Sequence, residues 1–341
     1  MQHACVVSAI SMMKRAPMAL RSSGWLRLVL WLWWPTLSLA LLLPPWRGWE
    51  QLRHIGPWAA LFKPTTCLSF LHPMVLYVDS ESTTTATTRL VPLASLPPYN
   101  ATTHRRVVAL SDTHGNHRCF TTSIPPCDVL LHCGDIMQRY GYLGSDVGGG
   151  RRALKDFATW LRHDVSQAKH KVLTGGNHDK LLQYMGKDAV RDLLTRHAGD
   201  KVVYLENEAV QVADLVIFAS PWSPVGRTSN TAFQSGHNAQ HLVDWALQQD
   251  KDDKNGMLQP HRYDQVDILM THAACDTWEE YVRAKQVKFW IHGHWHDGRG
   301  RIKQIPHQTN HKGYGGISIN VASNDMIYRA IHPPVVYDVC L

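Results

Sequence analysis

The sequence has no pair of cysteines at Cys-x-x-Cys spacing, and its seven cysteines are scattered along the chain. A thiolate zinc site and a disulfide framework both depend on regular cysteine patterns, so neither is expected. We predict reduced, partly buried thiols instead, which favours a reducing compartment. Internal repeats are also absent. The 341 residues are enough for one large domain or two small ones with a sizeable core.

Acidic residues are missing from residues 1–49, a leader that carries five basic residues. The net charge of +7 is concentrated there, because the charges of residues 50–103 cancel and residues 104–341 keep a balance of only +2. A strongly basic surface on the main part of the chain is therefore not expected. The high pI gives no strong evidence for a nucleic-acid partner.

Charge is absent from residues 28–46, an apolar run long enough to span a bilayer. Basic residues precede it, so we predict a membrane-associated protein with a cytosolic N-terminus. A mitochondrial or other organellar transit peptide, a cleaved signal peptide and a cytoplasmic protein stay open as alternatives. Residues 50–103 contain Ser/Thr and Pro clusters without periodicity and are predicted to be a linker. The main domain is then expected over residues 104–341.

Short apolar runs alternate with helix-like stretches from residue 105 onward. Strands are predicted over 106–110, 128–133, 171–176, 266–271 and 287–291, and helices over 151–163, 179–197 and 237–249. This alternation predicts an α/β domain with largely buried sheets. Because sites in such folds form at the carboxyl ends of strands, the polar residues that follow each run are candidates for function.

All five strands end in residue types that bind metal ions. The candidate ligands are Asp112, His114, Asp135, Asn177, His272, His294 and His296. Carboxylate, imidazole and amide oxygen suit Mn, Fe, Zn, Co or Ni. Seven ligands are too many for one four-coordinate ion and suit two ions that share a bridging carboxylate. Asp135 is the bridging candidate, because the preceding Gly134 lets the backbone come close. Such a pair can hold a hydroxide and bind two phosphate oxygens.

These motifs resemble one known superfamily. Asp112-x-His114, Gly134-Asp135, Gly176-Asn177-His178-Asp179, His272 and Gly293-His294-Trp295-His296 together look like the signature of the calcineurin-like metallophosphoesterases. The segments SPWSP at 220–224 and HDGRG at 296–300, with the tail at 319–339, are similar to the metallophosphoesterase-domain-containing (MPPED-like) branch. The resemblance covers about residues 105–341. It implies an α/β, four-layer sandwich of two mixed β-sheets flanked by helices.

The resemblance also implies roles for the site residues. One ion would be held by Asp112, His114, Asp135 and His296, and the other by Asp135, Asn177, His272 and His294. His178 would stand over the substrate phosphate, stabilise charge in the transition state and protonate the leaving oxygen. Asp179 would orient His178, with a helix N-cap as the alternative role. Some members of the branch have Gly where His294 stands, so the histidine here implies a complete two-metal centre.

The activity implied is hydrolysis of phosphoesters by attack of a metal-bridging hydroxide, with two divalent ions such as Mn, Fe or Zn. Phosphodiesters such as cyclic nucleotides are the expected substrates, so the partner is a small-molecule or nucleotide phosphoester. The alternative is a nucleotide-binding metal protein or scaffold with little turnover. The sequence leaves open the oligomeric state and the roles of His117, Arg118 and the loop from Gly141 to Gly150.

Overall fold

The computed structural model describes residues 73–79, 86–137, 147–225, 230–234, 239–248, 265–306 and 316–341. The predicted leader, its apolar segment 28–46 and the first part of the Gly141–Gly150 loop lie outside the described residues. Residues 147–150 form the first turn of a helix. Among the described helices, none combines the length and the apolar character that a bilayer crossing requires.

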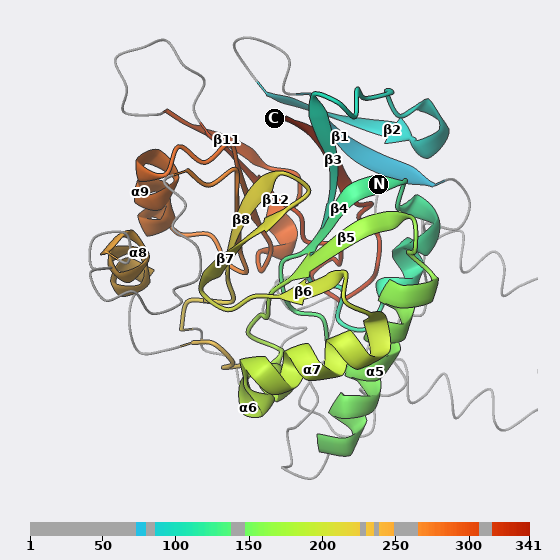
Figure 1. Cartoon of the computed structure of the whole chain (residues 1–341), viewed down its shortest axis with the longest axis vertical. Helices are drawn as coiled ribbons and strands as arrows, with labels where there is room; N and C mark the ends of the chain where they lie inside the picture. Colours follow the sequence, from blue (N-terminus) through green and yellow to red (C-terminus); the bar gives the residue numbers. More distant parts are fainter. Residues whose placement is uncertain are drawn as a thin grey trace, which may run out of the picture. The chain divides into compact units, whose positions relative to one another are not determined.

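A seven-stranded sheet forms one half of the sandwich, with strand order β2-β1-β13-β3-β4-β5-β6 (Figure 1). The strands are β1 (Met74–Asp79), β2 (Thr87–Pro92), β3 (His104–Leu110), β4 (Cys127–His132), β5 (Ala168–Leu173), β6 (Val202–Tyr204) and β13 (Val335–Cys340). Strands β3 to β6 are parallel, whereas β13 runs antiparallel to β3 and β2 antiparallel to β1. The sheet is therefore mixed, as predicted.

A six-stranded sheet forms the other half, with order β11-β12-β10-β9-β8-β7. Its strands are β7 (Glu208–Val212), β8 (Leu215–Ser220), β9 (Ile268–Thr271), β10 (Phe289–His292), β11 (Ile302–Ile305) and β12 (Gly316–Asn320). The central strands are parallel and the two edge strands antiparallel. Thr271 is in register with Ser220 on one side and with His292 on the other, so the loops after these strands start at one level.

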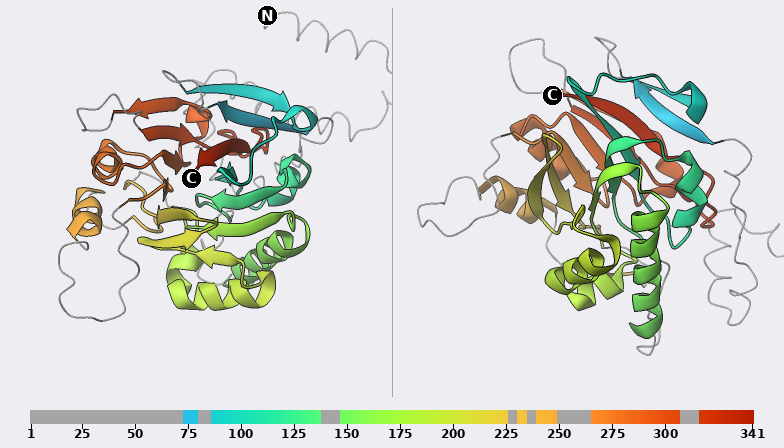
Figure 2. Two further views of the ribbon diagram at one scale, coloured as in Figure 1. Left: turned by 45° about the horizontal axis from the view of Figure 1, so that its top comes forward. Right: turned by 45° about the vertical axis from the view of Figure 1, so that its right-hand side comes forward.

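Helices cover the outer face of each sheet (Figure 2). The first sheet carries α5 (Val147–His163), α6 (Lys180–Met185), α7 (Lys187–Ala198) and the 3-10 turn η4 (His117–Ser123). The second carries α8 (Ala239–Gln248) and α9 (Asp276–Ala284). Shorter 3-10 turns are η3 (Leu93–Ser95) and η5 (His296–Gly298). The order of layers is helix, sheet, sheet, helix, which confirms the predicted four-layer sandwich.

The apolar pattern of the strands explains the layers. In β3, Val107 and Ala109 pack between the two sheets, while Val108 and Leu110 pack under the helices of the first sheet. Because both faces of the strand are buried, its sequence is a continuous apolar run rather than an alternation of apolar and polar residues. Helix α5 buries Leu154, Phe157, Ala158 and Leu161, which recur at helical spacing along one face.

The structure differs from the predicted linker over residues 74–92. Strand β1 pairs with β13 and with β2, so these residues belong to the first sheet and the domain begins before residue 104. The neighbouring Ser/Thr-rich run gives this stretch the composition of a loop, which hides two short edge strands. The predicted helix 179–197 is also divided, because Gly186 adopts φ 78° between α6 and α7.

Four of the described cysteines are free thiols, as predicted, although Cys340 is exposed rather than partly buried. Cys127 and Cys133 are buried free thiols, and Cys275 and Cys340 are free as well. Burial raises the pKa of the Cys127 thiol to about 12, so it stays protonated at neutral pH. Cys119 differs, because it is disulfide-bonded, and nothing in the cysteine spacing predicted this.

Candidate metal centre

The seven predicted ligands lie at the carboxyl ends of five strands, three from the first sheet and two from the second. Asp112 and His114 follow β3, Asp135 follows β4 and Asn177 follows β5; His272 follows β9, and His294 and His296 follow β10. The register of the central strands aligns these ends, since His132 of β4 is in register with Leu110 of β3 and Leu173 of β5.

The backbone at four of these positions is in the left-handed region. The φ angles are 55° at Asp112, 45° at His114, 51° at Asp135 and 67° at His294. Non-glycine residues seldom adopt such angles, and strain of this kind gathers at functional sites. Here it turns four side chains from three loops toward one point.

Glycines let the loops approach closely enough to bring the ligands together. A Cβ atom on Gly293 would lie 2.1 Å from Oδ2 of Asp112, and one on Gly176 would lie 2.4 Å from Oδ1 of Asp135. A Cβ on Gly134, where φ is 98°, would meet the carbonyl oxygen of Gly175 at 2.3 Å. These positions therefore require glycine, which accounts for the Gly in three of the sequence motifs.

Asp112, His114 and His296 form the first group of ligand atoms. Nε2 of His296 lies 3.3 Å from Nε2 of His114 and 3.3 Å from Oδ1 of Asp112. The other oxygen, Oδ2 of Asp112, accepts a hydrogen bond of 2.9 Å from the backbone N–H of His294. Oδ1 is buried without a hydrogen-bond partner of good geometry, so it remains available to a ligand.

Asn177, His272 and His294 form the second group. Oδ1 of Asn177 lies 2.9 Å from Nε2 of His272 and 2.9 Å from Nδ1 of His294. Asp135 stands between the two groups, since its Oδ2 lies 3.4 Å from Nε2 of His272 and 3.7 Å from Nε2 of His114. Its Oδ1 accepts the backbone N–H of His178 at 2.8 Å. All seven predicted ligands are thus brought together.

The ring orientations fit metal ions better than hydrogen bonds. Nδ1 of His272 faces the carbonyl of Cys133 at 2.9 Å, and Nδ1 of His296 faces the carbonyl of Asp325 at 2.8 Å. A neutral ring that donates from Nδ1 directs the lone pair of Nε2 into the pocket, the arrangement usual for metal-binding histidines. Two atoms each about 2.1 Å from one ion lie roughly 3.0–3.5 Å apart. The spacings above, from 2.9 to 3.7 Å, are close to that range.

The electrostatics of the pocket favour positive charge. Burial acts to raise the pKa of Asp135, but His272 and His178 hold it well below its ordinary value. Burial opposes charge on His272, yet Asp135 raises the pKa of that ring to about 9. Burial lowers the pKa of His114 well below its usual range, so this ring is neutral. The ionised carboxylates and the neutral His114 ring are in the protonation states that divalent cations require, and binding of a cation would release the proton that Asp135 holds on His272.

His178 lies beside the ligands, as the resemblance implies. Its Nε2 is 3.9 Å from Oδ2 of Asp135 and 2.9 Å from Nδ2 of Asn230, and its ring meets that of His114 edge-on with 4.5 Å between centroids. Burial lowers the pKa of His178, which favours the neutral ring at neutral pH. Asp135, His114 and His178 also place one ligand-type atom each within 4.8 Å of the others.

The carboxylate of Asp179 has different hydrogen-bond partners from those expected. Its carboxylate accepts the backbone N–H groups of Ile136 at 3.2 Å, Met137 at 3.0 Å and Gly176 at 3.0 Å. It precedes α6 but makes no side-chain cap hydrogen bond there. The carboxylate therefore ties the loop after β4 to the loop after β5, and so sets the position of Asp135 and Asn177 rather than the tilt of His178.

His117 and Arg118, left open by the sequence, belong to the packing of η4 against α5. Nε2 of His117 lies 3.2 Å from Oδ2 of Asp156, and Nη2 of Arg118 lies 2.7 Å from Oδ1 of the same carboxylate. Burial lowers the pKa of His117 to about 4. The neutral His117 ring and the charged Arg118 side chain thus both face Asp156 of helix α5.

Two residues at the centre have no signal in the sequence. Asn230 reaches His178 from the loop after β8, and Tyr328 lies in the loop before β13. The ring of Tyr328 meets His114 at 4.6 Å, His296 at 5.5 Å and His178 at 5.9 Å between centroids, and its φ is 63°. Neither residue ends an apolar run, so only the folded chain brings them to the histidines.

Comparison with known proteins agrees with this geometry. A family model described as calcineurin-like phosphoesterase matches residues 105–298. A UPF0046 protein of Caenorhabditis elegans is 26% identical over 137 residues, which are 38% of this chain and 43% of that protein. The match spans less than half of the relative's length. That relative belongs to the MPPED-like branch, as the sequence motifs implied.

Two solved structures match this chain at low identity and low TM-score. The protein TT1561 of Thermus thermophilus has a TM-score of 0.41 and 10% identity, over 65% of this chain and 90% of that one. AQ665 of Aquifex aeolicus has a TM-score of 0.28 and 14% identity, over 68% and 95%. Both are too distant to bear on activity. The family model carries the assignment, because it covers more than half of the sequence and includes all seven predicted ligands and His178. The chain belongs to the calcineurin-like phosphoesterase family.

Proposed function

We propose that this protein hydrolyses phosphodiesters with two divalent ions, Mn, Fe or Zn, held by the seven residues described above. Family membership and the cluster of His and Asp side chains support metal-dependent phosphoester hydrolysis. The observation that carries the two-ion proposal is the position of Asp135. Its Oδ2 stands between His272 of one ligand group and His114 of the other, at 3.4 and 3.7 Å.

Asp112, His114 and His296 would hold one ion, and Asn177, His272 and His294 the other, with Asp135 shared. Oδ2 of Asp135 faces both groups, whereas Oδ1 accepts the N–H of His178. When bound, a pair of cations supplies Lewis acidity for phosphate oxygens and an activated water at neutral pH. The fixed loops hold the ligands in place before the substrate arrives, so little reorganisation is needed during the reaction.

His178 would contact the substrate phosphate. It is placed beside Asp135 by its own backbone hydrogen bond, and Asn230 fixes the ring through Nε2. Burial favours the neutral ring, which would donate a hydrogen bond to a phosphate oxygen. The negative charge of that phosphate would raise the pKa of His178, so that the ring could take up a proton and then pass it to the leaving oxygen. Asn230 would release the ring nitrogen as the phosphate enters.

Hydrolysis of two chromogenic substrates by the full chain with Mn²⁺ tests the proposal. We expect release of p-nitrophenol from bis(p-nitrophenyl) phosphate, with slower release from the monoester p-nitrophenyl phosphate. Asp135→Asn should lower kcat by at least about 100-fold, since loss of one preorganised group in an active site typically costs that much. The control is Asp214→Asn, an exposed carboxylate paired with Arg105.

The outcomes separate the two candidate functions. A chain that binds divalent ions stoichiometrically yet cleaves neither ester with any of them is a metal-binding scaffold or nucleotide sensor. Faster cleavage of the monoester would keep the metal-dependent hydrolase and reject the diester preference. Full activity of Asp135→Asn would reject the shared-carboxylate centre itself.

A further inference from the structure

A cavity of about 450 Å³ adjoins the candidate metal centre. It is lined by His296, Asp297, Arg299, Asp325, Met326, Ile327, Arg329 and His332. His296 also belongs to the first group of predicted metal ligands, so its ring forms a wall common to the centre and the cavity. A molecule whose phosphate sits at the centre can therefore extend into this space.

Arg299 brings a positive charge to the cavity wall that the described residues leave largely uncompensated. Its Nε and Nη1 are buried and have no hydrogen-bond partner, while Nη2 donates to the carbonyl of Pro333. Burial lowers the pKa of this guanidinium to about 9, with no carboxylate acting against the shift. The side chain is still a cation at neutral pH. Buried arginines usually have paired donors, so the two unpaired N–H groups call for a partner.

The other charged groups of the cavity are already paired or exposed. Arg329 donates from Nε to Oδ2 of Asp325 at 2.7 Å, and its Nη2 lies 2.6 Å from the same oxygen. Asp325 also accepts two backbone N–H groups, at 3.1 Å from Ile327 and 2.8 Å from Arg329. Asp297 is exposed, so water screens its charge. Arg299 therefore dominates the electrostatics of the inner wall.

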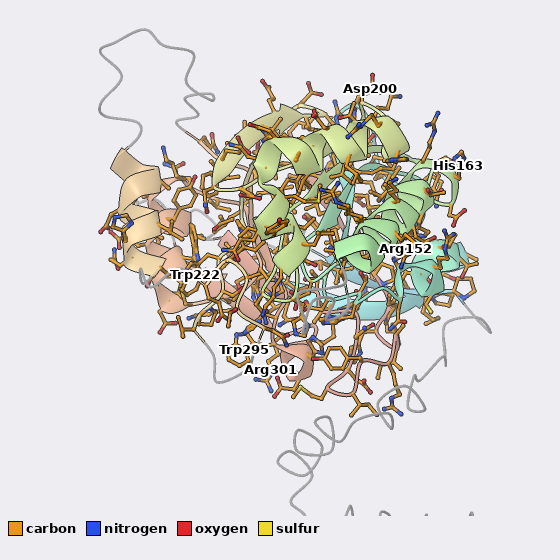
Figure 3. All side chains as sticks on the ribbon, turned by 90° about the horizontal axis from the view of Figure 1, so that it is seen from below. Arg152, His163, Asp200, Trp222, Trp295 and Arg301 are labelled. Atoms are coloured by element: carbon orange, nitrogen blue, oxygen red, sulfur yellow. The ribbon has the colours of Figure 1, made fainter. Side chains whose placement is uncertain are left out.

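Part of the wall is apolar. Met326 and Ile327 are 60% and 39% exposed, although both are large hydrophobic side chains on the loop next to the centre. Trp295 is 50% exposed and follows His294 on the loop after β10 (Figure 3). Of these, Met326 and Ile327 line the cavity, so an organic group bound there would cover them, whereas a simple inorganic ion would not.

We propose that this cavity is a second anion site, in which Arg299 binds a further phosphate at the end of the substrate remote from the cleaved ester. The inference rests on the proposed phosphodiesterase function and makes it more specific: the favoured substrates are nucleotide-like diesters that carry a second, terminal phosphate. Arginine is suited to this role, because its planar fork donates two hydrogen bonds to one phosphate. Met326 and Ile327 would contact the organic part in between.

A matched pair of substrates tests the second site. Thymidine 3′-(p-nitrophenyl phosphate) and its 5′-phosphorylated form release the same p-nitrophenol and differ only in the second phosphate. We expect kcat/KM of the full chain to be about tenfold higher for the 5′-phosphorylated form, chiefly through KM, as one charge-assisted contact allows. Arg299→Gln should bring the two substrates within about twofold and leave cleavage of bis(p-nitrophenyl) phosphate unchanged.

Two further variants serve as controls for misfolding and for a general effect of charge on substrate binding. Arg299→Lys keeps the charge without the fork and should give an intermediate preference. Arg301→Gln removes an exposed arginine two residues away and should keep the full tenfold preference. Equal use of the two substrates by the unmodified protein, or an undiminished preference in Arg299→Gln, would overturn the proposal.

A binding measurement separates failure of the second site from failure of the hydrolase. Calorimetric titration of thymidine 3′,5′-bisphosphate onto the metal-free, EDTA-treated chain should show binding that Arg299→Gln weakens about tenfold. Arg299-dependent binding without turnover of any ester would uphold the second site and reject the hydrolase. Turnover without Arg299-dependent binding or preference would uphold the hydrolase and reject the second site.

Discussion

Replacement of Gly293 by Ala is the sharpest perturbation of the metal centre that leaves every predicted ligand in the sequence. The added Cβ would lie 2.1 Å from Oδ2 of Asp112, 2.1 Å from Oγ of Ser111 and 2.6 Å from Cβ of Ser111. Ordinary carbon contacts need about 3.5 Å, so the loop after β10 and the loop after β3 must separate by more than about 1 Å. Both loops carry ligands of the first group.

Separation of the two loops would also break a hydrogen bond between them. The backbone N–H of His294 donates to Oδ2 of Asp112 at 2.9 Å, and this bond sets the orientation of the carboxylate. We expect a cost of about 1–3 kcal/mol in the free energy of unfolding from overpacking. A displaced ligand group should also lower metal affinity by at least about 10–100-fold, the range seen when groups that orient ligands are lost.

The assay is a titration of Mn²⁺ onto metal-free protein by calorimetry, with urea unfolding of the same sample. Gly298→Ala is the matched control, because it lies on the same loop and its Cβ would come no closer than 3.2 Å to Nδ2 of Asn320. Unchanged Mn²⁺ affinity in Gly293→Ala, with the fold intact, would refute the close approach of the two loops as the basis of the centre.

Two further predictions concern groups outside the ligand set. Burial lowers the pKa of His117 to about 4, below its ordinary value of 6.5, so the unfolded chain takes up a proton before the folded one does as the pH falls. The contribution of His117 to the free energy of unfolding is therefore complete above pH 6.5 and is lost as the pH falls from 6.5 to 4. His117→Gln should make the free energy of unfolding by urea less dependent on pH in that window. The control His163→Gln, at an exposed position, should leave the pH profile unchanged. Asp179→Asn removes one acceptor oxygen from three buried backbone amides, so the free energy of unfolding should fall by about 1–3 kcal/mol, against little change for the exposed Asp200→Asn. An unaltered pH profile, or equal stabilities of the two aspartate variants, would contradict these accounts.

The strands that lead to the metal centre were predictable because their signal is local. The expected runs 106–110 and 128–133 are β3 and β4 with shifts of one or two residues. A parallel strand buried on both faces must be apolar along its whole length, and the loop after it must turn sharply. Glycine and ligand residues directly after such a run can therefore be recognised from the sequence alone.

The edge strands and the supporting residues had no comparable signal. Strand β1 is a short run that pairs with β13, and the two are more than 250 residues apart in sequence. Asp179 has the spacing expected of a helix cap, yet it bonds amides on a neighbouring loop. Whether a carboxylate caps its own helix or binds another loop depends on which loop the sheet places beside it.

The sequence by itself determined which residues can bind metal ions and the edge of the sheet at which they gather, since strand ends and residue chemistry are both local properties. Only the tertiary structure decided that Oδ2 of Asp135 lies between the two ligand groups. It also decided that Arg299 lies beside them with two buried, unpaired nitrogens. The reason is physical: charge and hydrogen bonding in a buried pocket depend on atoms from distant segments, and only packing of the two sheets sets the distances between those atoms.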